Sequence, residues 1–197
     1  MKSPPALEQF NKLNLTDASQ LYFTDLQWED GGALAEPYYD FIHGGVGQFA
    51  FSARRDLWIL FDEWNPAEEP YVIFFGHGSE GTVYAKCFRD FLIRRTIEEY
   101  TNSWYLDEQP DVDKADQFFR TYPDKLRPII GDDAAQALQK LIEGRSLKVD
   151  DGVCGYLSED EMLSASKELI GFDEFDAEVQ LDRDAPDYDG MKRPGTN

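Results

Sequence analysis

Residues 71–92 read YVIFFGHGSEGTVYAKCFRDFL, and this stretch decides the expected fold. Its opening run of apolar residues is long enough for one buried strand, and Gly76 ends that run. After a glycine-rich loop, side chains recur at a spacing of three or four residues, which predicts a helix with one apolar face that could cover a sheet. The residues with this spacing are Val83, Cys87, Phe88, Phe91, Leu92, Arg95 and Tyr100.

Two more strands are expected upstream of this stretch. Residues 48–53 alternate phenylalanine with smaller or polar side chains, and residues 57–61 form a second apolar run that precedes an Asn-Pro turn. Joined in order with residues 71–75, these strands predict a meander. Residues 5–23 have a looser helical spacing of apolar side chains, which indicates a helix near the N-terminus.

The second half of the chain has the pattern of helices. Residues 132–143 carry apolar side chains on one side, and Gly144 follows them. Ser158 and Glu161 have the spacing of a capping box, in which each side chain accepts a hydrogen bond from the backbone N–H of the other residue. This predicts a further helix that ends at Gly171. The fold class is therefore expected to be α+β, with a mainly antiparallel sheet covered by helices and a helical C-terminal extension.

The acidic stretch 107–113 contains a proline and is the expected boundary between these halves. Residues 1–106 are then an α+β domain. Residues 107–181 are a helical region that either packs on the same core or folds separately. Residues 182–197 hold two prolines and four aspartates, so we expect a mobile acidic tail.

Composition excludes several classes of function. Hydrophobic residues make up 42% of the chain and aromatic residues 14%, which is too apolar for a disordered acidic polypeptide. The 39 acidic and 19 basic residues give a formal charge of -20, which repels nucleic acid and anionic lipid and attracts basic partners. Charge alone cannot separate a steering role from simple solubility.

The spacing of the cysteines and the length of the apolar runs indicate the cellular compartment of the protein. Cys87 and Cys154 are far apart and have no metal-site or disulfide-framework spacing, which is typical of a reducing compartment. Residues 1–10 lack the apolar segment of a secretory signal, and the apolar runs are far shorter than the roughly 20 residues of a membrane-spanning helix. A cytoplasmic protein is therefore expected, with no membrane partner.

A glycine pattern invites a nucleotide-binding interpretation. Gly76, Gly78 and Gly81 form GxGxxG after an apolar strand and before the expected helix, as in dinucleotide-binding loops. However, Glu80 adds a negative charge to the loop, and no second apolar strand follows the expected helix. We therefore favour a connection from strand to helix in which glycine supplies positive φ.

No other set of residues predicts catalysis. Ser79 beside His77 would need His43, from another glycine-rich turn, to form a triad. Cys87 could act as a nucleophile, but its place on the apolar face of the expected helix indicates a buried structural thiol. Two histidines and two cysteines without close spacing do not form a zinc signature. We expect no enzyme activity, no cofactor and no metal site.

An acidic and aromatic cluster lies where two predicted strands connect. Its residues are Asp62, Glu63, Trp64, Asn65, Glu68 and Glu69. Recognition is often carried by loops on a rigid sheet, and a tryptophan among carboxylates can contact arginine or lysine through cation–π and charged interactions. We expect Asp62, Glu63, Trp64, Glu68 and Glu69 to contact a partner. The alternative is an exposed turn with Trp64 folded into the core.

The sequence of residues 71–92 resembles the closing strand, loop and covering helix of the SUKH superfamily. The shared pattern is an apolar strand, a Gly-Ser-Glu-Gly turn, and Tyr-Ala before a Phe-x-x-Phe-Leu helix. Residues 39–51, with an aromatic, glycine-rich turn and alternating phenylalanines, are similar to the preceding strand of that superfamily. The resemblance covers roughly residues 39–105.

The resemblance implies a mixed α+β fold without catalytic residues. Many bacterial SUKH proteins are immunity proteins that bind and block a polymorphic toxin in the producing cell. An acidic surface suits such an inhibitor when the toxin is basic, because it accelerates encounter. The function expected on this basis is neutralisation of a cognate, basic toxin. Two alternatives stay open: a nucleotide-binding protein or enzyme that uses Gly76 to Gly81, and an acidic regulatory protein that mimics nucleic acid.

Overall fold

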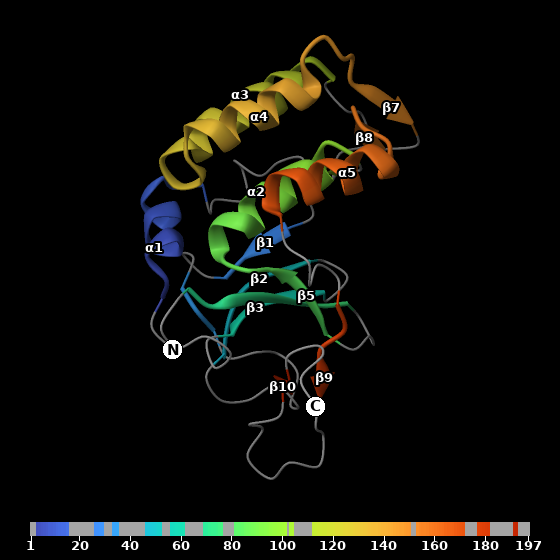
Figure 1. Ribbon diagram of the computed structural model, residues 1–197. Helices are drawn as coiled ribbons and strands as arrows, with labels where there is room; N and C mark the ends of the chain where they lie inside the picture. Colours follow the sequence, from blue (N-terminus) through green and yellow to red (C-terminus); the bar gives the residue numbers. More distant parts are fainter. Residues whose placement is uncertain are drawn as a thin grey trace.

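The computed structural model describes residues 3–15, 26–29, 33–35, 46–52, 56–61, 69–76, 81–101, 103–104, 112–150, 153–171, 177–181 and 191–192. These residues form a five-stranded antiparallel sheet and five main helices, which confirms the α+β class (Figure 1). The sheet has the order β1 (Leu26–Trp28), β2 (Val46–Ser52), β3 (Leu57–Phe61), β4 (Tyr71–Phe75) and β5 (Thr82–Ala85). The helices are α1 (Pro5–Lys12), α2 (Phe88–Glu99), α3 (Val112–Ile130), α4 (Asp132–Ile142) and α5 (Glu159–Ile170).

Two smaller sheets complete the described fold. One has the order β6 (Ser103–Trp104), β8 (Val153–Gly155) and β7 (Lys148–Asp150). The other pairs β9 (Gln180–Leu181) with β10 (Met191–Lys192), on the side of the main sheet opposite α2 (Figure 1). Met191 and Lys192 are thus held in a strand, where the sequence indicated a mobile tail. The remaining residues of 182–197 lie outside the described part of the chain.

The central strands are buried on both faces, which explains why their sequences are apolar throughout and do not alternate. In β3, Trp58 and Leu60 join the core cluster on the α2 side of the sheet, whereas Leu57, Ile59 and Phe61 join the cluster on the other side. The predicted strands 57–61 and 71–75 are confirmed as β3 and β4.

The helix predicted from Val83 onward is wrong at its start. Val83 lies in β5, opposite Ile73 of β4, and α2 begins only at Phe88. The side chains of Val83 and Tyr84 belong to the two opposite core clusters, as strand geometry requires. The three- and four-residue spacing from Val83 arose by coincidence, because pairing with β4 decides the conformation of this segment.

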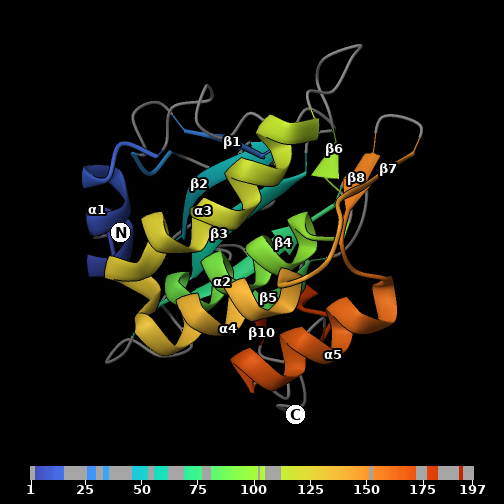
Figure 2. The same ribbon diagram turned by 90° about the horizontal axis from the view of Figure 1, so that it is seen from above.

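Helix α2 lies at the centre of the helical layer (Figure 2). It packs against α1, α3, α4 and α5 as well as β4 and β5. Consequently even polar residues of this helix, such as Asp90, Arg94 and Glu99, are at least nine-tenths buried. The sequence predicted a covering helix with one apolar face, whereas α2 is surrounded on most sides.

Helix α3 runs through two internal prolines, Pro123 and Pro128. Proline at position 123 leaves the Phe119 carbonyl without its usual N–H partner in the helix. The hydroxyl group of Tyr100 donates a hydrogen bond to that carbonyl at 3.3 Å. Gln9 of α1 donates from Nε2 to the carbonyl of Pro128 at 2.9 Å, in the last turn of α3, where carbonyls lack helical N–H partners. The Tyr100 hydroxyl group therefore helps this helix to tolerate Pro123.

The predicted helix ends in the second half are confirmed. Ser158 and Glu161 form the expected capping box at the start of α5, and Gly171 ends that helix with a left-handed backbone, φ +61°. Helix α4 ends at Ile142, one residue before the predicted limit, and Gly144 follows with φ +69°. These ends are set by local chemistry, so the sequence alone reveals them.

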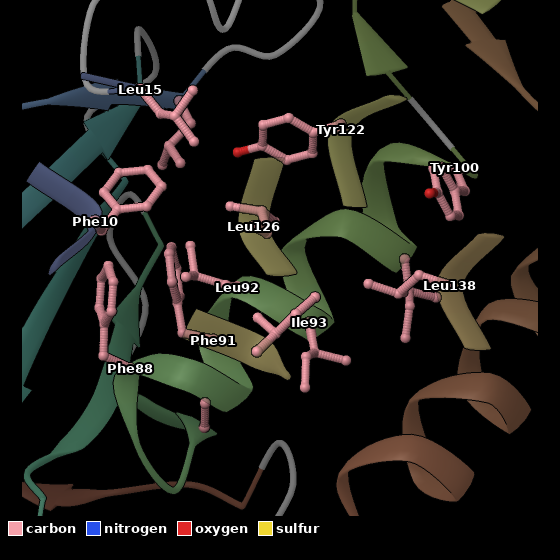
Figure 3. Packing of buried hydrophobic residues seen from close by; sticks show 14 of the residues in the cluster. Phe10, Leu15, Phe88, Phe91, Leu92, Ile93, Tyr100, Tyr122, Leu126 and Leu138 are labelled. Carbon is pink, nitrogen blue, oxygen red and sulfur yellow. The ribbon is translucent and has the colours of Figure 1, made fainter. Parts of the chain in front are cut away.

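One buried cluster runs through both halves of the described chain (Figure 3). It joins Phe10 of α1 and Phe91 of α2 with Leu126 of α3 and Leu138 of α4, and it reaches Ala165 of α5. The described C-terminal helices thus share a core with the sheet. Residues 105–111, which include most of the expected boundary, lie outside the described residues, and α3 begins at Val112.

The C-terminal segment also extends the main sheet. The backbone N–H of Val83 donates to the Ala177 carbonyl at 2.9 Å, and that of Val179 donates to the Gly81 carbonyl at 2.7 Å. Val179 is fully buried against the sheet face that lies away from α2. Residues 177–179 therefore cover the edge of β5, which would otherwise expose unpaired backbone groups.

Candidate partner-binding surface

The connection between β3 and β4 was predicted to contact a partner. Asp62, Glu63, Trp64 and Glu68 lie outside the described residues, so their role stays a prediction. Glu69 is described, two residues before β4, and is half-buried.

Both ends of this connection are fixed at one end of the sheet. Phe61 and Tyr71 pair directly across β3 and β4, and each is only 1% exposed. Val46, the first residue of β2, pairs with Phe61 on the other side. The connection is therefore anchored at two adjacent, buried aromatic residues.

Glu69 borders an open depression of about 510 Å³. The depression lies where the N-terminal helix, the junction of β5 with α2, and the end of α3 meet. Its described lining is Pro5, Ala6, Gln9, Glu69, Lys86, Cys87, Arg89 and Ile129. A place where segments so distant in the chain converge cannot be read from the sequence. The signal that was available is the charged pattern Lys-Cys-Phe-Arg-Asp at residues 86–90.

The acids and the thiol at this depression influence one another. Burial raises the pKa of the Glu69 carboxyl and the Asp90 carboxylate raises it further, whereas a hydrogen bond from Cys87 and the charge of Arg89 lower it in part. Burial, followed by the charge of Asp90, raises the pKa of the Cys87 thiol to about 12. Cys87 is thus protonated at neutral pH, which disfavours its action as a nucleophile.

Cys87 was expected on the apolar face of a helix, and that placement is wrong. It is the residue that precedes α2, with an extended backbone, and it is half-buried at the wall of the depression. Its displacement follows from the late start of the helix at Phe88. The other cysteine, Cys154, is buried in β8, and neither Cys87 nor Cys154 forms a disulfide.

Arg89 holds the rim of the depression in place. Its Nη1 donates to Oδ1 of Asp90 at 3.0 Å, and its Nε donates to the carbonyl of Ile130, the last residue of α3, at 3.1 Å. Lys86 is exposed beside it. The arrangement therefore presents two cations and the Glu69 carboxyl group to solvent, which suits contacts to charged groups of a partner.

Acids outnumber bases among the described residues, 19 to 14. Many of these acids pair with arginine. The pairs include Arg94–Glu98, Arg95–Glu99, Arg120–Asp116, Arg127–Asp124 and Arg145–Glu161. The stretch 62–68 alone contributes three acids and no base.

The structure corrects the interpretation of the glycine-rich loop. Gly76 and Gly81 flank a connection between the antiparallel strands β4 and β5, not a connection from strand to helix. A dinucleotide-binding loop needs a helix N-terminus directly after it, where N–H groups meet the pyrophosphate. Since α2 begins only at Phe88, that context is missing.

Gly81 is required for close packing, whereas the sequence analysis expected it to supply a positive φ. Its φ lies outside the left-handed region, so positive φ does not explain this glycine. A Cβ atom there would lie 2.6 Å from Cε1 of the Phe75 ring, closer than such atoms approach. Close packing against Phe75 therefore accounts for the glycine without a ligand.

The structure does not test the serine and histidine candidates for catalysis. Ser79, His77 and His43 lie outside the described residues. Among the residues that the structure describes, no group of three histidine, cysteine, aspartate or glutamate side chains could hold a metal ion. Within the same residues, no helix has the length and apolar character needed to cross a membrane.

Comparisons with known proteins add no relative to these observations. No family model, no curated protein and no solved structure matches the chain.

Proposed function

We propose that this chain is a non-catalytic, cytoplasmic immunity protein that binds and neutralises a basic polymorphic toxin. The observations that carry the proposal are the formal charge of -20 and the acidic connection between β3 and β4, whose ends are fixed at Phe61 and Tyr71. Such a surplus of acids over bases favours recognition of a cationic partner. The resemblance of residues 39–105 to the SUKH superfamily supports the same function.

The anchoring of residues 62–69 supports a role in binding. Phe61 and Tyr71 fix both ends of this stretch against neighbouring strands. A recognition segment whose ends are already held loses less conformational entropy when it binds than a free segment does. Carboxylates beside Trp64 offer arginine and lysine side chains both charged and cation–π contacts.

Electrostatics favours a basic partner. A field from many like charges can raise association rates by roughly 10- to 1,000-fold, an effect that salt screens. An inhibitor that must reach its toxin before the toxin acts benefits from fast encounter. The pKa of Cys87, raised to about 12, supports a non-catalytic role for the only half-buried thiol of the described residues.

Co-expression with the toxin encoded beside its gene tests the proposal. We expect cells that carry both proteins to grow and the two chains to co-purify. The absence of both a complex and protection would refute the proposal. The triple variant Asp62→Asn, Glu63→Gln and Glu68→Gln should protect less well, because it removes the acids of the anchored connection.

A further inference from the structure

A small enclosed cavity lies between β1, α2 and α3. Its volume is about 20 Å³. Much of its wall is aromatic or aliphatic, but Trp28, Arg95, Thr96 and Glu99 bring polar groups to it. The cavity thus lies where the edge strand of the main sheet packs on the helical layer, and it is not purely apolar.

Trp28 supplies a hydrogen-bond donor that no described residue satisfies. The residue is only 9% exposed, and its indole Nε1 is buried with no hydrogen-bond partner in the described part of the chain. Water hydrates this N–H in the unfolded chain, so leaving it unpaired destabilises the folded state. Since Trp28 lines the cavity, a partner placed there would relieve this cost.

Acceptors line the same cavity. Glu99 is paired with Arg95, yet a carboxylate has about four lone-pair sites and can accept further hydrogen bonds. Thr96 donates its hydroxyl hydrogen to the Leu92 carbonyl at 2.7 Å, so its oxygen can still accept. Tyr122 is another wall residue; burial, followed by the charge of the nearby Glu99, raises the pKa of its hydroxyl group, and the charge of Arg95 lowers it in part.

The volume of the cavity limits the size of the molecule that it can hold. A cavity needs about 10–15 Å³ to hold one water molecule, and a buried water molecule makes about three hydrogen bonds. A space of about 20 Å³ therefore admits one water molecule and no organic ligand or cofactor. We propose that this cavity binds one ordered water molecule, which accepts a hydrogen bond from Trp28 Nε1 and donates to Glu99 and Thr96.

Such a water molecule would connect β1 to α2. Trp28 belongs to the edge strand of the main sheet, whereas Thr96 and Glu99 belong to the central helix. The site is independent of the proposed toxin-binding function, because it involves neither residues 62–69 nor the depression beside Glu69.

Trp58 provides a matched control within the same chain. Its Nε1 is also buried without a hydrogen-bond partner among the described residues, and the side chain is 3% exposed. It does not belong to the wall of the cavity, and the Arg95 guanidinium lies 5.6 Å from its ring centroid. The two indoles share a buried, unpaired N–H but differ in whether the side chain lines the cavity.

Replacing each tryptophan by 3-benzothienylalanine tests the proposal, because sulfur takes the place of the N–H with little change in shape. In the full chain, we expect the analogue at position 28 to lower the urea midpoint and the analogue at position 58 to leave it unchanged or raise it. The Trp28 indole proton of the native protein should show a nuclear Overhauser contact to long-lived water. A midpoint at position 28 that stays or rises, with no such contact in the native protein, would overturn the proposal.

Discussion

The Tyr100 hydroxyl group donates a hydrogen bond to the Phe119 carbonyl at 3.3 Å, and so joins the end of α2 to the middle of α3. That carbonyl is the one that Pro123 leaves without a helical partner. A residue at the end of one helix therefore compensates for a proline in another.

Replacing Tyr100 by phenylalanine should lower the free energy of unfolding by about 1 kcal/mol, because a buried hydrogen bond is lost with little change in packing. In a chain that already carries Pro123→Ala, position 123 regains an N–H for the Phe119 carbonyl. In this background, Tyr100→Phe should lower the free energy of unfolding by less than it does in the native chain. Urea denaturation of the four chains measures this coupling, and equal costs in both backgrounds would show that the two residues do not cooperate.

Gly155 lies against the end of α2. A Cβ atom there would lie 2.3 Å from the Thr101 carbonyl oxygen, and backbone atoms cannot move aside as a flexible side chain can. We expect Gly155→Ala to destabilise the protein by about 3 kcal/mol through overpacking. Gly171→Ala is the control, because φ is +61° and no atom lies within 4 Å of the added Cβ. That change should cost only about 1 kcal/mol of backbone strain. Urea denaturation measures the free energy of unfolding of both variants. A smaller loss of stability for Gly155→Ala than for Gly171→Ala would contradict the close contact between Gly155 and the Thr101 carbonyl.

Glu161 should make the stability of α5 dependent on pH. Hydrogen bonds from Arg145, followed by those from Ser158, lower the pKa of the Glu161 carboxyl from 4.5 to about 2. Its charge therefore stabilises the fold above pH 4.5, and this contribution is lost as the pH falls through 2. Glu161→Gln retains an acceptor at the capping position, so it isolates the effect of charge. The stability difference between the native chain and this variant should shrink as the pH falls from 5 to 2. A difference that is constant over this range would refute the assignment.

Cys87 should react slowly with alkylating reagents. A pKa of about 12, in place of the ordinary 9.0, reduces the thiolate fraction at pH 8 by about 1,000-fold. In a Cys154→Ala chain, which leaves Cys87 as the single thiol, iodoacetamide labelling should be slower by this order than labelling of the urea-unfolded chain. Asp90→Asn should accelerate it, because the charge of Asp90 helps to raise the pKa. Labelling of the folded chain at the unfolded rate would contradict this environment.

Much of the fold could be predicted from local sequence patterns. The strands β3 and β4 could be predicted because continuous apolar runs end at turn residues, and α5 because Ser158 and Glu161 cap it. The start of α2 could not, since only the pairing of Val83 with Ile73 shows that the preceding segment is a strand. The sequence did not predict α3 as a separate helix, because it contains two prolines and the hydrogen bond from Tyr100 that compensates for Pro123 forms only in the folded chain.

Only part of the candidate surface could be predicted from the sequence. The sequence singled out Glu69 by its acidic and aromatic neighbours. It could not show that Gln9, Lys86 and Arg89 gather around this residue, because three separate segments meet there only in the folded chain.

The association rate constant with the toxin encoded beside its gene tests the central claim most directly. It should be measured by stopped-flow at low and high salt for the native chain, for Asp62→Asn/Glu63→Gln/Glu68→Gln, and for a control with three exposed acids removed elsewhere, Glu143→Gln/Asp160→Asn/Glu168→Gln. Both variants lose the same charge. We expect the first to associate about 10-fold more slowly at low salt, with most of the difference lost at high salt, and the control to change far less. Equal slowing of both variants, or no slowing of either, would contradict a binding role for the connection between β3 and β4.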